Sequence, residues 1–238
     1  MKSISATDVR QIPVLLRGEP EPINAWMQEW NAGRVLLYVA VILVGTGVYG
    51  AAMGCWRAPL QAWYTAVKFP LIILLTTLGN ALLNGMLAPL LGLNLGFRQS
   101  ALAILMCFTI AAAILGAFSP VVFFLVWNAP PLSARAEISS ATYSFIQLSH
   151  VALIAFAGVT ANVRLFQLLQ RLSGSAHVAR KILFAWLAGN LFLGSQLSWI
   201  LRPFIGLPDL PVEFLRANAF QGNFYETVLH AVGRLLFP

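Results

Sequence analysis

The residue with the clearest potential for chemistry is His150, which lies inside a long apolar stretch. An imidazole at such a position can ligate haem or a pigment, or relay protons. No other histidine shares this setting, because His177 falls between two apolar stretches and His230 belongs to the C-terminal tail. We therefore favour a neutral imidazole that is hydrogen-bonded across helices, for example to the face carrying Asn80 and Asn84, and keep ligand binding as the alternative.

Uncharged polar residues repeat at helical spacing in three of the apolar stretches. The three sets are Thr76, Asn80 and Asn84; Ser144, Gln147 and His150; and Asn190, Gly194 and Ser198. Residues three or four apart share one face of a helix. The structural interpretation is a polar interior held by interhelical hydrogen bonds, each worth about 1 kcal/mol or less. The functional alternative is a path for a neutral or amphiphilic molecule such as a lipid.

Other catalytic or metal-binding patterns are missing from the sequence. It contains no HExxH motif, no glycine-rich phosphate loop in a suitable context and no CxxC motif. Glu137 is the single acid between Glu29 and Asp209, so the interior has no paired carboxylates. Cys55 and Cys107 fit neither a disulfide framework nor a zinc site. We expect no enzymatic activity, no metal, no cofactor and no coupling to ions.

The elements that carry these residues are predicted to be transmembrane helices. The chain is 59% hydrophobic and 10% charged, with a mean hydropathy of +0.78, which is outside the range of soluble domains. A helical span needs about 20 apolar residues, and five charge-free stretches are long enough. The fold class is therefore all-α, a polytopic bundle of about five spans, at residues 34–54, 68–91, 99–118, 141–163 and 182–201.

These spans form one transmembrane domain, residues 34–203, between two short tails. The N-terminal tail, residues 1–33, contains an amphipathic stretch around Trp26 and Trp30. The C-terminal tail, residues 204–238, contains an amphipathic helix at 224–237 that we expect to lie on the membrane or the bundle. The first tail has mixed charge and no early apolar region, so we predict no signal peptide.

Two features indicate where the predicted span at residues 99–118 ends and where a loop follows it. Ser119-Pro120 is expected to end or kink the third helix, because proline disfavours helical geometry at the preceding residue. The segment Val121–Trp127 would then either continue the span or re-enter the interface. We place Glu137 in the following loop, beside Arg135.

Small residues mark the faces on which helices can approach closely. Glycine removes the side chain that would otherwise hold a neighbouring helix away. The predicted helix-packing glycines are Gly45, Gly47, Gly50, Gly54, Gly158 and Gly194.

The formal net charge of +7 is carried by residues near the predicted helix ends. This distribution favours lipid headgroups as the partner over nucleic acid. The connection with Arg164, Arg171, Arg180 and Lys181 contains no acid, so we place it in the cytoplasm, with the N-terminus inside and the C-terminus outside. We expect a bacterial cytoplasmic membrane, and Lys68 should extend to the headgroups at the start of its span.

The segment from about Tyr64 to Leu201 resembles the Yip family of five-span membrane proteins. The resemblance rests on Lys68-Phe69-Pro70 leading into Leu71–Leu75, a short break before the third span, and Ser119-Pro120 near its end. It implies a membrane-organising or partner-binding role without a cofactor.

Three functions follow as hypotheses. The first is a non-enzymatic scaffold or accessory subunit, which docks other membrane subunits through glycine-rich helix faces and amphipathic tails. The second is a permease or lipid-handling component that moves a neutral or amphiphilic substrate. The third is a pigment- or haem-binding subunit that uses His150.

Overall fold

The computed structural model describes residues 6–93, 95–131, 136–207 and 210–226, and it describes no side chains for residues 136–140. Within these ranges the chain is helical, with no strand. The helices are α1 (Gln11–Arg17), α2 (Pro20–Gln28), α3 (Ala32–Gly54), α4 (Pro59–Leu90), α5 (Phe97–Asn128), α6 (Ala136–Ser173) and α7 (Ala176–Ile200). Most of the predicted amphipathic helix at 224–237 lies outside the described residues.

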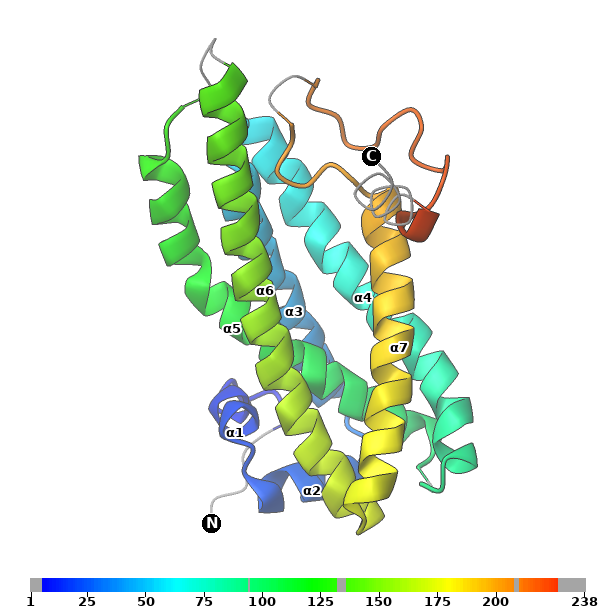
Figure 1. Cartoon of the computed structure of the whole chain (residues 1–238). Coiled ribbons are helices and arrows are strands. Elements are labelled where there is room, and N and C mark those ends of the chain that lie inside the picture. Colours follow the sequence, from blue (N-terminus) through cyan, green and yellow to red (C-terminus); the bar gives the residue numbers. More distant parts are fainter. Residues whose placement is uncertain (1–5, 94, 132–135, 208–209, 227–238) are drawn as a thin grey trace.

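Helices α3 to α7 form an antiparallel bundle (Figure 1). Helix α3 lies centrally and makes its most extensive contacts with α5 and α4. The lower end of the bundle in Figure 1 carries α1, α2 and the connections α4–α5 and α6–α7. The upper end carries the connections α3–α4 and α5–α6 together with the segment that follows α7. These names for the two ends are kept below.

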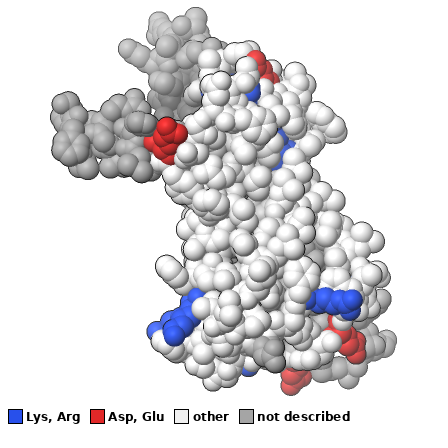
Figure 2. Space-filling view, turned by 90° about the vertical axis from the view of Figure 1, so that its right-hand side faces the viewer, with Lys and Arg blue, Asp and Glu red and all other residues white. Residues whose placement is uncertain are grey.

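Four of the described helices, α3, α4, α5 and α6, are long and apolar enough to cross a membrane. Figure 2 shows the charged side chains gathered near the two ends, with an uncharged band between them on the face drawn. Together these features indicate a membrane location. Helix α7 is less apolar, because it carries Asn190 and Gln196, and a fifth span there remains a prediction.

The helices extend beyond the predicted spans. Helix α5 continues through Pro120 to Asn128, so Val121–Trp127 lengthens the same helix and does not re-enter. Hydroxyl groups and neighbouring helices can satisfy backbone groups that a proline frees, so a proline need not end a membrane helix. The prediction of a loop at Glu137 was wrong, because α6 begins at Ala136.

The glycines of α3 bring the neighbouring helices close. A methyl group added at Gly50 would lie 2.5 Å from the Thr65 carbonyl oxygen, and one at Gly54 would lie 2.6 Å from that of Gln61. At Gly45 the added group would collide with the Ala112 carbonyl of α5. Helix α3 therefore meets both α4 and α5 through positions where no side chain fits.

The other predicted packing glycines make looser contacts. A methyl group at Gly47 would make ordinary contact with the Ala66 carbonyl oxygen at 3.5 Å. At Gly194 it would meet only Thr76, at 3.9 Å, and at Gly158 it would meet no atom within 4 Å. In the described chain Gly158 thus does not mark a close helix contact.

The N-terminal helices cover the lower end of the bundle. Arg34 of α3 is buried and donates hydrogen bonds to Gln11 Oε1 and to the Trp26 carbonyl, both at 3.2 Å. Tyr38 also donates to Gln11 Oε1, at 3.2 Å. The amphipathic stretch therefore packs on the bundle at Trp26, which is 7% exposed, while Trp30 is 50% exposed.

Candidate functional site

A cavity of about 500 Å³ lies at the upper end, between α4, α6, α7 and residues 202–207. Helices α6 and α7 meet at the connection near Gly174 and diverge toward the upper end (Figure 1). The lining combines apolar side chains with a few polar ones: Phe69, Ile72, Val151, Ile154, Trp199 and Ile205 with Gln147, His150, Ser198, Arg202 and Arg216. This composition and size are typical of a small-molecule site.

His150 of α6 lies in the wall of this cavity and is 4% exposed. Its Nδ1 is 2.9 Å from the Tyr49 hydroxyl of α3, and the two rings meet edge to face with centroids 5.5 Å apart. The imidazole thus forms a hydrogen bond across helices, with Tyr49 and not with the face of Asn80 and Asn84. Among the described residues Nε2 has no partner. A buried imidazole nitrogen without a partner is a candidate ligand contact.

Lys68 of α4 is fully buried, contrary to the expectation that it extends to the headgroups. Its Nζ donates a 2.9 Å hydrogen bond to the Pro203 carbonyl. The ammonium also faces the rings of Tyr64, Phe204 and Phe214, with 5.0–6.0 Å to the centroids. The lysine turns inward because the chain after α7 folds back over α4 and supplies a carbonyl and aromatic faces.

Two more side chains of α4 fix this returning segment. Gln61 Nε2 donates to the carbonyls of Pro203 and Phe204, at 3.1 and 2.7 Å. The Thr65 hydroxyl donates to the Phe204 carbonyl at 2.6 Å. With Lys68, these residues form an anchor that holds one wall of the cavity against the bundle.

Arg202 and Arg216 place positive charge at the cavity. The Arg202 guanidinium lies 3.6 Å from the centre of the Trp199 ring and donates to the carbonyls of Trp199, at 2.6 Å, and Asn218, at 3.4 Å. Burial, and then the positive charge of Arg216, lower the pKa of Arg202. No acid forms an ion pair with either arginine among the described residues.

The three sets of uncharged polar residues predicted from the sequence have different roles in the structure. Asn80 of α4 donates to the Asn190 side chain of α7, and Asn84 donates to Asn80 at 3.3 Å. The buried Thr76 hydroxyl has no partner in the described part of the chain. Asn80 and Asn190 therefore join α4 to α7 below the cavity, and Asn84 supports Asn80. By contrast, the exposed Gln147 and the half-buried Ser198 lie in the cavity wall.

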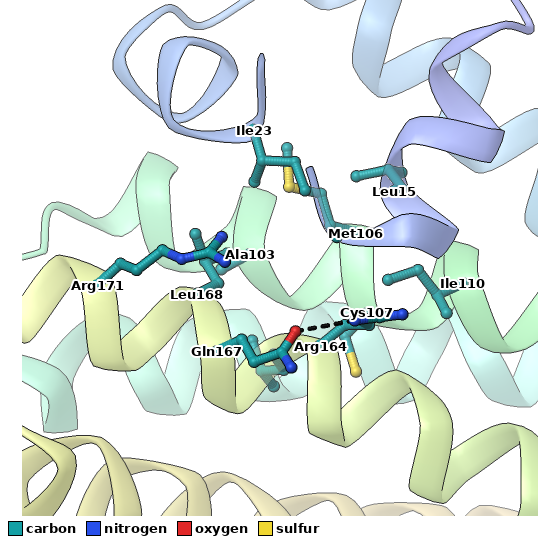
Figure 3. Close-up of a pocket in the computed structure, with 12 residues that line it drawn as sticks. Leu15, Ile23, Ala103, Met106, Cys107, Ile110, Arg164, Gln167, Leu168 and Arg171 are labelled. Carbon is teal, nitrogen blue, oxygen red and sulfur yellow. Dashed lines mark hydrogen bonds between the residues drawn. The ribbon is translucent and has the colours of Figure 1, made fainter. Parts of the chain in front are cut away.

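A second, much smaller cavity lies at the lower end, between α1, α5 and α6 (Figure 3). Its volume of about 20 Å³ is room for about one water molecule, so it is no ligand site. Arg164 in its wall donates to the Leu16 carbonyl at 3.0 Å and to Gln167 at 3.1 Å. Arg164 thus attaches α1 to the bundle, whereas Arg171, Arg180 and Lys181 are exposed.

The sequence predicted Gln147, His150 and Ser198, which line the cavity, but not the residues that complete it. Arg202, Arg216 and Tyr49 were not among the predicted site residues. A buried role for Lys68 could have been suspected from its position nine residues after Pro59, well inside α4. The segment after α7, residues 201–223, contains no regular helix or strand in its described part. Its sequence therefore has no hydrophobic periodicity from which its position could be predicted.

No group of three histidines, cysteines or acids that could hold a metal ion occurs among the described residues. No family model, curated protein or solved structure matches this chain. The resemblance to the Yip family therefore stays a prediction, and the function must be argued from the cavity.

Proposed function

We propose that this protein is a lipid-handling membrane protein that binds one amphiphilic molecule in the upper cavity. The observation that carries the proposal is the mixed character of the cavity wall. Apolar side chains of α4 and α6, such as Ile72 and Ile154, line the same cavity as Ser198, Arg202 and Arg216. An amphiphile matches such a wall because its chain and its headgroup need different surroundings.

Access from the bilayer supports this proposal. Val151 and Ile154 line the cavity and are nevertheless 57% and 37% exposed. The cavity is therefore open on the side of α6, whose surface faces lipid if the helix spans the membrane. A lipid chain could enter there without crossing the aqueous phase.

The scaffold hypothesis has less support from the geometry. Its docking surfaces were the glycine faces and the amphipathic tails. Gly45, Gly50 and Gly54 are covered by α4 and α5, and the stretch around Trp26 packs on the bundle. Two of the surfaces proposed for partner subunits are thus used within the chain itself.

The proposal also includes an orientation of the protein in the membrane. The basic residues of the lower end include Arg17, Arg98, Arg171, Arg180 and Lys181, and those of the upper end include Arg57, Arg202 and Arg216. By the positive-inside rule we assign the lower end to the cytoplasm of a bacterial cell and α7 to a fifth span. The cavity then lies on the outer side of the cytoplasmic membrane.

The proposal is tested by filling the cavity. Val151→Trp places an indole in the wall, whereas Val159→Trp adds the same group to an exposed position of α6 that does not line the cavity. Purified protein would be titrated with a fluorescent fatty amphiphile, and bound lipid would be counted by native mass spectrometry. We expect Val151→Trp to weaken binding about tenfold or more and Val159→Trp to leave it unchanged. Equal binding by both variants would overturn the proposal.

A second candidate is haem or pigment binding, which is favoured by the unpartnered Nε2 of His150. The hydrogen bond between Nδ1 and the Tyr49 hydroxyl is the kind of contact that orients a ligating imidazole. Titration with haemin should then shift the Soret band of free haemin to that of a histidine-ligated haem, and His150→Ala should abolish the shift. A spectrum that remains that of free haemin at saturating concentration would exclude this function and leave the lipid proposal in place.

A further inference from the structure

The charged side chains that line the upper cavity in the described part of the chain, Arg202 and Arg216, are both positive. Lys68, Arg202 and Arg216 lie near one another, and Arg216 is close enough to act electrostatically on the other two. None of the three forms an ion pair with an acid among the described residues. Positive charges at the edge of a low-dielectric region repel one another, and a bound anion offsets this repulsion.

The two arginines retain unused hydrogen-bond donors. A guanidinium carries five N–H groups, and among the described residues those of Arg202 make two hydrogen bonds, both to backbone carbonyls. Stacking on Trp199 fixes the plane of this group. Arg216 lines the cavity, and its side chain has no hydrogen-bond partner among the described residues. Both side chains can therefore donate to a ligand.

We propose that the amphiphile bound in the upper cavity is an anionic membrane lipid, whose phosphate or carboxylate headgroup is held by Arg202 and Arg216. This inference rests on the proposed lipid-handling function and specifies the ligand class. Guanidinium groups bind planar or tetrahedral oxyanions through paired N–H donors, which makes arginine suited to both headgroup types.

Lys68 has a different role from the two arginines. It does not line the cavity, and its ammonium is already bound by the Pro203 carbonyl and the aromatic rings. It contributes positive potential and holds the segment that carries Arg202. His150 lines the cavity together with Val151 and Ile154 of α6, so the chain of the lipid would run past the imidazole.

The experiment compares ligands that share a twelve-carbon chain. Protein in dodecyl maltoside would be titrated with dodecyl phosphate, dodecanoate and dodecylphosphocholine, each competing with the fluorescent amphiphile, and inorganic phosphate would serve as a headgroup without a chain. We expect dodecyl phosphate and dodecanoate to compete about tenfold more tightly than dodecylphosphocholine, and inorganic phosphate to fail at the same concentrations.

Variants of Arg216 test whether the arginines cause the preference for anionic ligands. Arg216→Gln should reduce the preference for the anionic ligands several-fold, and Arg216→Glu should reverse it in favour of dodecyltrimethylammonium. Arg216 has no hydrogen bond to lose among the described residues, so both variants should fold. Arg180→Gln is the matched control, because Arg180 is exposed at the opposite end. It should bind like the wild type.

The outcomes separate the two proposals. Equal competition by anionic and zwitterionic ligands, unchanged by Arg216→Gln, would overturn the anionic headgroup while lipid binding stands. Competition by inorganic phosphate as strong as that by dodecyl phosphate would replace the lipid with a soluble anion. Loss of the Val151→Trp effect would instead remove the proposed function itself.

Discussion

Lys68 of α4 and Pro203, three residues beyond the end of α7, are joined by a hydrogen bond of 2.9 Å from the ammonium to the backbone carbonyl. This bond links positions 135 residues apart in the sequence. It holds the segment that carries Arg202 against the N-terminal part of α4. This segment forms one wall of the upper cavity.

The first prediction concerns this anchor. Lys68→Met keeps the length of the side chain but removes the donor, so the segment at residues 203–207 should open more often. Hydrogen–deuterium exchange should show faster exchange of its amides, since local opening controls that rate. Lys181→Met replaces an exposed lysine at the lower end and should leave the segment unchanged. Unaltered exchange in Lys68→Met would show that Gln61 and Thr65 suffice to hold it.

The second prediction concerns the close approach of α3 and α4. Gly50→Ala introduces a methyl group 2.5 Å from the Thr65 carbonyl oxygen, so the helices must move apart. We expect a loss of about 1–3 kcal/mol in the free energy of unfolding, the usual range for overpacking. Denaturation in mixed micelles measures it. Gly158→Ala adds the same group where no atom lies within 4 Å and should be neutral or stabilising. Equal stabilities of the two variants would contradict the observed packing.

The third prediction concerns the amide pair that joins α4 and α7. Asn190→Leu leaves the buried Asn80 amide without its partner and should lower the free energy of unfolding by about 0.5–2 kcal/mol. The double variant Asn80→Leu/Asn190→Leu should be less destabilised than the sum of the single variants. Strict additivity in this double-mutant cycle would show that the pair contributes nothing to stability.

The fourth prediction concerns topology. In a variant without the native cysteines, His177→Cys and Asn218→Cys place one exposed thiol at the lower and the upper end, respectively. A membrane-impermeant maleimide added to intact cells should label only Asn218→Cys, because we place the upper end outside. After cell lysis both should react. Labelling of His177→Cys alone in intact cells would reverse the assignment.

The sequence was sufficient to predict the helical class and the positions of the long apolar helices. Helix α3 was predicted at residues 34–54 and spans Ala32–Gly54. The predictions were less accurate at Pro120 and Glu137, where helices continue past a proline and begin before an acid. Local signals such as proline and charge indicate where a helix can end, whereas packing against neighbouring helices decides whether it does.

The candidate site likewise has features that the sequence predicts and features that depend on tertiary contacts. The sequence by itself determined that the interior would be polar but without acids, because composition fixes which side chains are present. Only the tertiary structure decided that Tyr49 is the partner of His150 and that Lys68 turns inward. It also brought Arg202 and Arg216 to an apolar cavity. These contacts join residues far apart in the chain, and the segment after α7 has no periodic pattern from which its path could be inferred.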